Sequence, residues 1–106
     1  MNISYSFKNL TPSEKSICQN YFESKVPKLQ KSIDNLYSEA YLEVRIEKFV
    51  KKSAYNVALS LKSSPAIFAS EDDHTLNEAI DLALGKLMHE LRKLNDTRKD
   101  HWEKQH

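Results

Sequence analysis

The stretch EAIDLALGKLMHELRKL, Glu78 to Leu94, decides the expected fold, because its apolar residues recur at the three- and four-residue spacing of an amphipathic helix. The apolar stripe that would cover a core consists of Leu76, Ala79, Ile80, Ala83, Leu84, Leu87, Leu91 and Leu94. Basic residues gather in the second half, at Lys86, His89, Arg92 and Lys93. All of these but Arg92 fall on a single stripe of the helix. The stretch therefore predicts a helix that packs on a core and offers cations on another side.

Three segments upstream alternate apolar and polar residues, which is typical of half-buried strands. They cover residues 2–7, 37–50 and 55–61. A short apolar run at 66–70 follows Pro65 and predicts a fourth strand, and the proline suits an edge or a strand end. Because only short polar turns separate the last three strands, we expect them to form an antiparallel meander.

A second helix is predicted near the N-terminus, where Thr11-Pro12-Ser13-Glu14 combines a capping residue, a proline suited to the first helical position and a glutamate that completes a capping box. Apolar residues then recur at helical spacing as far as Ile33, and the polar run 32–35 ends the helix. Pro27 removes one backbone hydrogen bond, so we expect a kink or a break there. By counting, Lys25 falls inside the apolar stripe and must reach around it to water.

The expected order is strand, helix, three strands, helix. It predicts an α+β domain over residues 1–95, β-α-β-β-β-α, with a four-stranded sheet that carries both helices on one face. The acidic run 71–75 precedes the last helix and would complement the positive end of its dipole. Residues 96–106 are almost wholly polar and are expected to form a flexible tail, with Trp102 as its only anchor.

Composition sets limits on function. The chain has 106 residues, one cysteine, one glycine and a net charge of +1. No apolar run is long enough to span a membrane, and a lone cysteine fits a reducing, cytoplasmic setting. A single glycine excludes the glycine-rich loops that cradle nucleotides. Because the net charge is small, an anion-binding face would have to come from the placement of cations and not from their total.

Catalytic and metal-binding arrangements find little support. Cys18 lies in the apolar stripe of the first helix, as a buried structural thiol does. The run Asp72-Asp73-His74 stands where helix-capping residues belong. Glu43 and Glu47 lie on the outer face of a strand, where cross-strand ion pairs account for them. We therefore expect no enzyme, no metal and no cofactor.

The placement of basic residues is more informative. On the first helix Lys28 and Lys31 lie beside the apolar stripe and Lys25 falls inside it. On the last helix Lys86, His89 and Lys93 form one stripe, and Arg92 lies further round. If the helices pack side by side, these edges form one groove-like cationic face; the alternative is a solvated surface of interspersed lysine and glutamate. Lys51 and Lys52, in the turn between the second and third strands, are a weaker addition.

The element order and several short stretches resemble a known family, that of the ribosome hibernation-promoting factor and ribosome-associated inhibitor, also called sigma-54 modulation protein. KVPKLQK, residues 25–31, is similar to the basic end of the family's first helix, and AIFAS, residues 66–70, to its last strand. Ala79-Ile80-Asp81 and Lys86-Leu87 match the family's signature on the last helix. Departures are Thr75 for an acidic residue, Asn77 for a tyrosine, Asn56 for an acidic residue and the missing glycines before the fourth strand.

The resemblance implies a double-stranded-RNA-binding-like fold and a short-form hibernation factor, monomeric off the ribosome. Such proteins bind the small ribosomal subunit, with its 16S ribosomal RNA, in the channel of the A and P sites. There they exclude messenger and transfer RNA in stationary phase or stress. The expected RNA contacts are then the seven basic residues of the two helices, Lys25, Lys28, Lys31, Lys86, His89, Arg92 and Lys93. The alternative is a protein-interaction module without RNA binding, which would use the open sheet face with Tyr41 and Arg45 as anchors.

Overall fold

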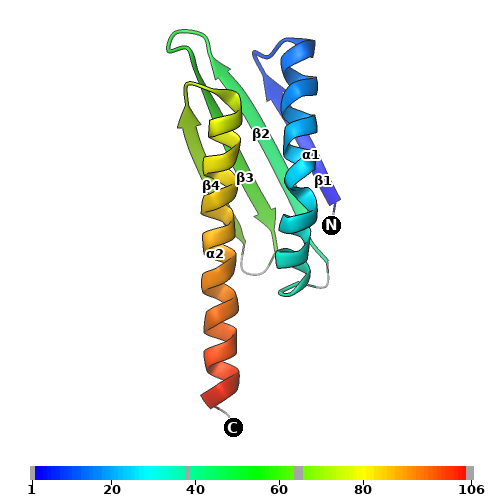
Figure 1. Ribbon diagram of the computed structural model, residues 1–106, viewed down its shortest axis with the longest axis vertical. Coiled ribbons are helices and arrows are strands. Elements are labelled where there is room, and N and C mark those ends of the chain that lie inside the picture. The colour runs from blue at the N-terminus through cyan, green and yellow to red at the C-terminus, as the bar shows by residue number, and fades with distance from the viewer. Residues whose placement is uncertain (1, 38, 64–65, 105–106) are drawn as a thin grey trace.

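The computed structural model describes residues 2–37, 39–63 and 66–104, with side chains as far as residue 96. The elements follow the expected order. They are β1 (Asn2–Lys8), α1 (Pro12–Asp34), β2 (Tyr41–Phe49), β3 (Ala54–Lys62), β4 (Ile67–Asp73) and α2 (Leu76–Lys104). Figure 1 shows both helices side by side on one face of the sheet, as predicted. Within the described residues, neither helix has a stretch long and apolar enough to cross a membrane.

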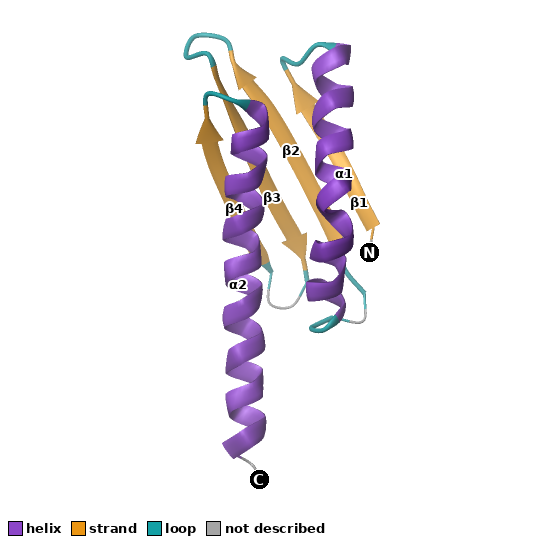
Figure 2. Ribbon diagram, viewed as in Figure 1, coloured by secondary structure: helices purple, strands orange, loops and turns teal. Residues whose placement is uncertain are grey.

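The four strands lie in the order β1-β2-β3-β4. β1 and β2 are parallel, with Ile3 opposite Leu42, while the pairs β2–β3 and β3–β4 are antiparallel. The meander expected of the last three strands is confirmed. The parallel pair follows from α1, because a strand that returns to the sheet after a crossover helix runs in the same direction as the strand before it. The prediction of an α+β domain with a β-α-β-β-β-α order is thus correct (Figure 2).

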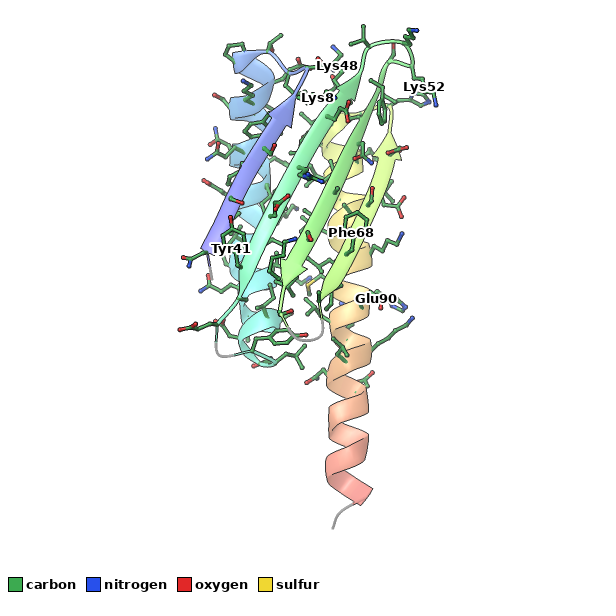
Figure 3. The ribbon with its side chains drawn as sticks, turned by 180° about the vertical axis from the view of Figure 1, so that it is seen from behind. Lys8, Tyr41, Lys48, Lys52, Phe68 and Glu90 are labelled. Carbon is green, nitrogen blue, oxygen red and sulfur yellow. The ribbon has the colours of Figure 1, made fainter. Side chains whose placement is uncertain are left out.

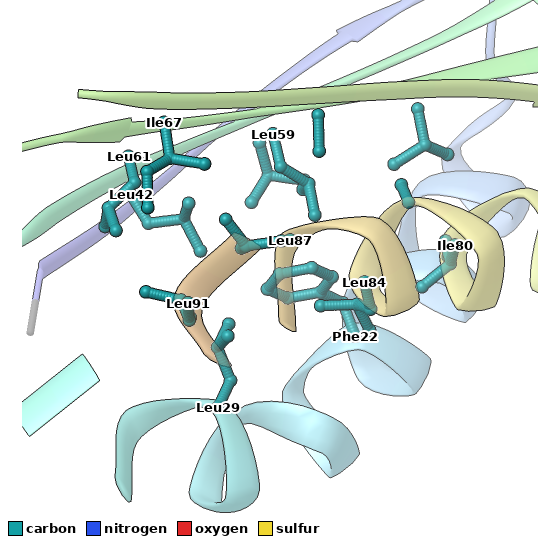
Figure 4. Close-up of a cluster of buried hydrophobic side chains, with 14 of the residues drawn as sticks. Phe22, Leu29, Leu42, Leu59, Leu61, Ile67, Ile80, Leu84, Leu87 and Leu91 are labelled. Atoms are coloured by element: carbon teal, nitrogen blue, oxygen red, sulfur yellow. The ribbon is translucent and has the colours of Figure 1, made fainter. Parts of the chain in front are cut away.

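The core lies between the sheet and the two helices. Every second residue of β2 and β3 faces it, so that Val44 and Leu59, which are cross-strand neighbours, are both fully buried. From the helices come Phe22 and Leu29 of α1 and the predicted stripe of α2 (Figure 4). Burial of apolar surface against both helices is the main force that holds this layer together. Because the two helices share this core, their exposed flanks lie beside each other.

α1 begins as predicted. The Thr11 hydroxyl accepts a hydrogen bond from the Glu14 amide at 3.1 Å, and a Glu14 carboxylate oxygen accepts one from the Thr11 amide at 3.0 Å. Of the expected kink or break at Pro27, the break does not occur, since α1 is a single helix from Pro12 to Asp34; the kink stays a prediction. A helix packed along its whole length on a core can tolerate one missing backbone hydrogen bond on its exposed side, and Pro27 is exposed.

The boundaries of β4 and α2 differ from the prediction. β4 continues through the acidic residues to Asp73, because pairing of Asn56 with Asp72 and of Tyr55 with Asp73 extends the ladder with β3. Only Asp73 keeps the expected place near the helix start, where its carboxylate accepts a hydrogen bond from the Thr75 amide at 3.1 Å. α2 does not end at Asn95 but extends to Lys104, beyond the end of the sheet in Figure 1. The side chain of Trp102 lies outside the described residues, and the flexibility of the tail stays a prediction.

Candidate nucleic-acid interface

A groove of about 260 Å³ runs between α1 and α2. Its lining residues, from both helices, are Lys25, Lys28, Leu29, Asp81, Leu84, Gly85, Met88 and Arg92. Leu29 and Leu84 belong to the core, so they form an apolar floor that continues inward to the packed interior, where Leu29 points toward Leu91 (Figure 4). The three cations stand around this floor. Three of the seven predicted contact residues therefore meet at one place, from segments about sixty residues apart in the sequence.

Lys25 does not lie inside the apolar stripe, contrary to simple counting. It is exposed, and its ammonium nitrogen stands 5.2 Å from the ring centroid of Tyr21, one helical turn earlier. The ring attracts the cation through its quadrupole and holds it at the mouth of the groove. The charge of Lys25 is thus placed by an aromatic ring and not cancelled by a carboxylate.

The groove carries one acidic side chain, Asp81. Its two carboxylate oxygens accept hydrogen bonds from the Tyr21 hydroxyl, both at 2.8 Å, so the pair ties α1 to α2. The hydrogen bond to Asp81 raises the pKa of Tyr21, since the carboxylate favours the protonated hydroxyl. With three cations and one carboxylate, the lining of the groove is net positive although the whole chain is nearly neutral.

The four basic residues of α2 divide across two flanks of the helix, and Arg92, which was expected to lie off the stripe of Lys86, His89 and Lys93, is the one that lines the groove. Lys86 and Lys93 turn away from α1, and each meets an acid. The Lys86 ammonium lies 3.6 Å from a carboxylate oxygen of Glu71 on β4, and the Lys93 ammonium 3.5 Å from one of Glu90. These pairs are exposed, so each contributes little to stability. Even so, each carboxylate lowers the positive potential on that flank. The expectation of one continuous cationic face is therefore met only on the α1 side.

The other predicted residues are less closely grouped. Lys31 and His89 are exposed but do not line the groove. Lys51 and Lys52 lie in the β2–β3 turn, at the end of the sheet opposite the C-terminal half of α1 (Figures 1 and 3). The structure does not bring these two lysines to the groove.

The open face of the sheet is polar and largely paired (Figure 3). The Nε atom of Arg45 lies 3.0 Å from the Oε1 atom of Glu43, and the Nζ atom of Lys8 lies 3.8 Å from the Oε2 atom of Glu47. Tyr41 is 42% exposed on β2, and Phe68 is 63% exposed on β4. The two aromatic residues are separated by β3, so they do not form one apolar patch. Of the two anchors proposed for a protein partner, Arg45 is already engaged within the chain.

The residues considered for metal binding or catalysis have structural partners. Asp72 accepts a hydrogen bond from the Asn56 amide nitrogen at 2.6 Å, and a ring nitrogen of His74 lies 3.3 Å from the Ser53 carbonyl. Cys18 is fully buried, and burial raises the pKa of its thiol. A thiol with a raised pKa is a poor nucleophile at neutral pH.

Three residues that line the groove, Asp81, Gly85 and Met88, are not among the contacts that the sequence predicts. Asp81 belongs to the Ala79-Ile80-Asp81 signature on the last helix. Gly85 is the one of these residues that the sequence could have marked, because a glycine in the middle of a predicted helix is unfavourable. It is exposed in the middle of α2, where glycine costs about 1 kcal/mol relative to alanine. A Cβ atom at Gly85 would meet nothing within 4 Å, so the fold itself does not require a glycine here.

Comparisons with known proteins agree with the observed fold. The chain superposes on the Thermus thermophilus Protein Y N-terminal domain with a TM-score of 0.66 at 22% identity, covering 89% of this chain and 99% of that one. It also superposes on a ribosomal subunit interface protein from Coxiella burnetii with a TM-score of 0.61 at 14% identity, covering 91% and 99%. Identities this low show a shared fold. A search of curated proteins found no significant match.

The family described as Sigma 54 modulation protein / S30EA ribosomal protein matches residues 3–99. The match covers nearly the whole chain and confirms the resemblance carried by residues 25–31, 66–70 and 75–94. It also confirms that the chain belongs with ribosome-associated proteins and not with enzymes. The chain is therefore a member of the sigma 54 modulation protein / S30EA ribosomal protein family.

Proposed function

We propose that this protein is a ribosome hibernation factor that inhibits translation by binding the small ribosomal subunit through the α1–α2 groove. In this proposal it occupies the channel of the A and P sites and blocks transfer and messenger RNA in stationary phase or stress. Membership of a ribosomal protein family supports the association with ribosomes. The observation that carries the RNA contact is the convergence of Lys25, Lys28 and Arg92 on one groove with a single carboxylate.

Phosphate recognition explains how a chain with a net charge of +1 can bind RNA. Contacts to the RNA backbone need a few cations at the right positions and depend little on total charge. Two neighbouring helices that present such cations can recognise the shape of folded RNA without reading its sequence. Inhibition by occupancy of the channel needs no catalytic group.

In this proposal, the remaining predicted residues contribute to RNA binding to different degrees. Lys31 and His89 extend the cationic surface from the groove along α1 and the outer side of α2. Lys86 and Lys93 contribute less, because a phosphate must compete with Glu71 and Glu90 for them. Lys51 and Lys52 would reach only RNA that also passes the opposite end of the sheet. We further propose that the protein acts in the cytoplasm and is monomeric off the ribosome.

Co-sedimentation with isolated small ribosomal subunits tests the proposal. The variant Lys28→Glu/Arg92→Glu reverses two exposed charges in the groove, and Lys51→Glu/Lys52→Glu reverses two exposed charges far from it. A charged hydrogen bond contributes about 1.5 kcal/mol or more, so loss of two should weaken binding by about a hundredfold or more. The turn variant, with the same change in net charge, should retain most binding. Equal losses would show that only bulk charge matters, and full binding by the groove variant would refute the site.

The alternative function is a protein-interaction module on the open sheet face, for which Tyr41 and Arg45 are the predicted anchors. Arg45 is paired with Glu43, whereas the ring of Tyr41 is exposed, as is that of Phe68, across β3 from it. A pull-down from lysate treated with nuclease separates the two functions. A protein partner that is retained without RNA and lost in Tyr41→Ser/Phe68→Ser would favour the module. Retention of small subunits by that variant would favour the ribosome proposal.

A further inference from the structure

The only glycine of the chain, Gly85, lines the groove between α1 and α2. Gly85 is helical and exposed, its Cβ direction is open, and it weakens the helix relative to alanine. A glycine that the fold does not need, in a groove lined by cations, leaves room for a ligand to approach the backbone of α2 closely at this point.

The chemistry of the groove differs from that of a simple phosphate site. Around Gly85 it offers an apolar floor of Leu29, Leu84 and Met88. Phosphates gain nothing from such a floor, whereas the flat face of an unstacked nucleobase does. The Met88 thioether is polarisable and packs well on a π-system, and the planar guanidinium of Arg92 can stack on a base.

Asp81 gives the groove a possible means of choosing a base. Each carboxylate oxygen has two acceptor sites, and the Tyr21 hydroxyl supplies one proton to the pair. Acceptor capacity therefore remains. A base edge with two adjacent N–H donors, as in guanine, can use both oxygens, whereas uracil cannot.

We propose that the α1–α2 groove binds one unstacked nucleotide of RNA, preferably guanosine, with its base against Gly85 and its phosphate on Lys28 and Arg92. Asp81 accepts hydrogen bonds from the base edge, and the floor packs on its face. This inference rests on the proposed function, because it specifies what the same groove holds when the protein is on RNA.

Two substitutions at Gly85 test the proposal with small-subunit binding and thermal unfolding. Gly85→Leu fills the open space over the floor, and Gly85→Ala adds a single carbon. Both should keep or raise the melting temperature, since each replaces a helical glycine. Gly85→Leu should weaken binding by about tenfold or more, and Gly85→Ala by much less. The control Gln30→Leu adds a leucine at an exposed position of α1 outside the groove, and this variant should bind like the wild type. Wild-type affinity in Gly85→Leu would overturn the inference.

Nuclear magnetic resonance offers an independent readout, because the single glycine gives one backbone amide signal in the glycine region. A guanosine-containing single-stranded tetranucleotide should shift the Gly85 signal, and a duplex of the same composition should shift it less. If the signals of Lys28 and Arg92 move while that of Gly85 stays, the groove binds phosphate alone and the inference is wrong. If wild-type protein does not bind small subunits at all, it is the proposed function that fails.

The substitution Asp81→Asn should change the affinity for RNA in opposite directions, according to whether the groove binds phosphate alone or also a guanine base. Removal of a negative charge from a pure phosphate site should tighten RNA binding. If Asp81 accepts from guanine, Asp81→Asn should instead weaken binding of the guanosine tetranucleotide severalfold and leave a uridine tetranucleotide unchanged or tighter. Tighter binding of both would refute the role given to Asp81.

Discussion

The salt dependence of binding to small ribosomal subunits should report how many cations of the protein contact phosphate. Each contact lowers the logarithm of the binding constant by about 0.7 to 0.9 per decade of salt. If only Lys25, Lys28 and Arg92 take part, the slope should be about −2 to −3. If all six predicted lysines and arginines of the helices contributed equally, it should be about −4 to −5. We expect a value nearer the smaller range, because Lys86 and Lys93 have acidic neighbours.

Filter binding over a salt series, with matched neutral variants, measures this slope. Lys28→Met should make it shallower by about 0.7 to 0.9, whereas Lys86→Met should change it by less. Both residues are exposed lysines on helices, so the two substitutions remove the same charge and differ only in position. Equal effects would show that the Glu71 pair does not withhold Lys86 from RNA. A wild-type slope near zero would refute phosphate contact by the groove.

Two further predictions concern the fold that positions the groove. Phe22→Ala should lower the free energy of unfolding by about 3–5 kcal/mol in urea titrations, because Phe22 is fully buried between the sheet and α2; a loss under 1 kcal/mol would contradict the packing. Hydrogen bonds from the Thr11 amide and the Tyr55 hydroxyl, in that order, hold the pKa of Glu14 below its ordinary value of 4.5. Because the folded-state pKa is depressed, this stabilisation is present above pH 4.5 and is lost as the pH falls through the folded pKa. Glu14→Gln should therefore flatten the acid limb of the stability curve, and an unchanged acid limb would show that Glu14 is not coupled to folding.

Features that depend on neighbours in the sequence were predictable. The alternation of apolar residues in β2 and β3 and the helical spacing in α2 placed nearly all of the core on the correct face. The capping box of Thr11 and Glu14 could be predicted because it needs only a spacing of three residues. The packing of both helices on one face followed from the element order and the apolar stripes.

Features that depend on distant residues were not predictable in this way. Nothing near Lys86 in the sequence shows that Glu71 reaches it, because that contact depends on how α2 crosses β4. The extension of β4 through its acidic residues depends on a ladder partner on β3, which supplies the Asn56 side chain to Asp72. Simple counting also misplaces Lys25, whose side chain is exposed and lies over the ring of Tyr21, a contact that the spacing of apolar residues does not show.

The distribution of ion pairs explains how a nearly neutral protein could meet RNA in one orientation. On the open sheet face, Lys8 and Arg45 are matched by neighbouring glutamates. On the β4 side of α2, Lys86 is matched by Glu71. Where α1 and α2 meet, by contrast, Lys25, Lys28 and Arg92 share a groove with a single carboxylate, that of Asp81. In the field of a polyanion such a molecule is steered by this asymmetry, although its net charge is only +1. The acidic partners on those two faces lower the positive potential there, and so favour an approach of the polyanion to the groove over an approach to the open sheet face or to the β4 side of α2.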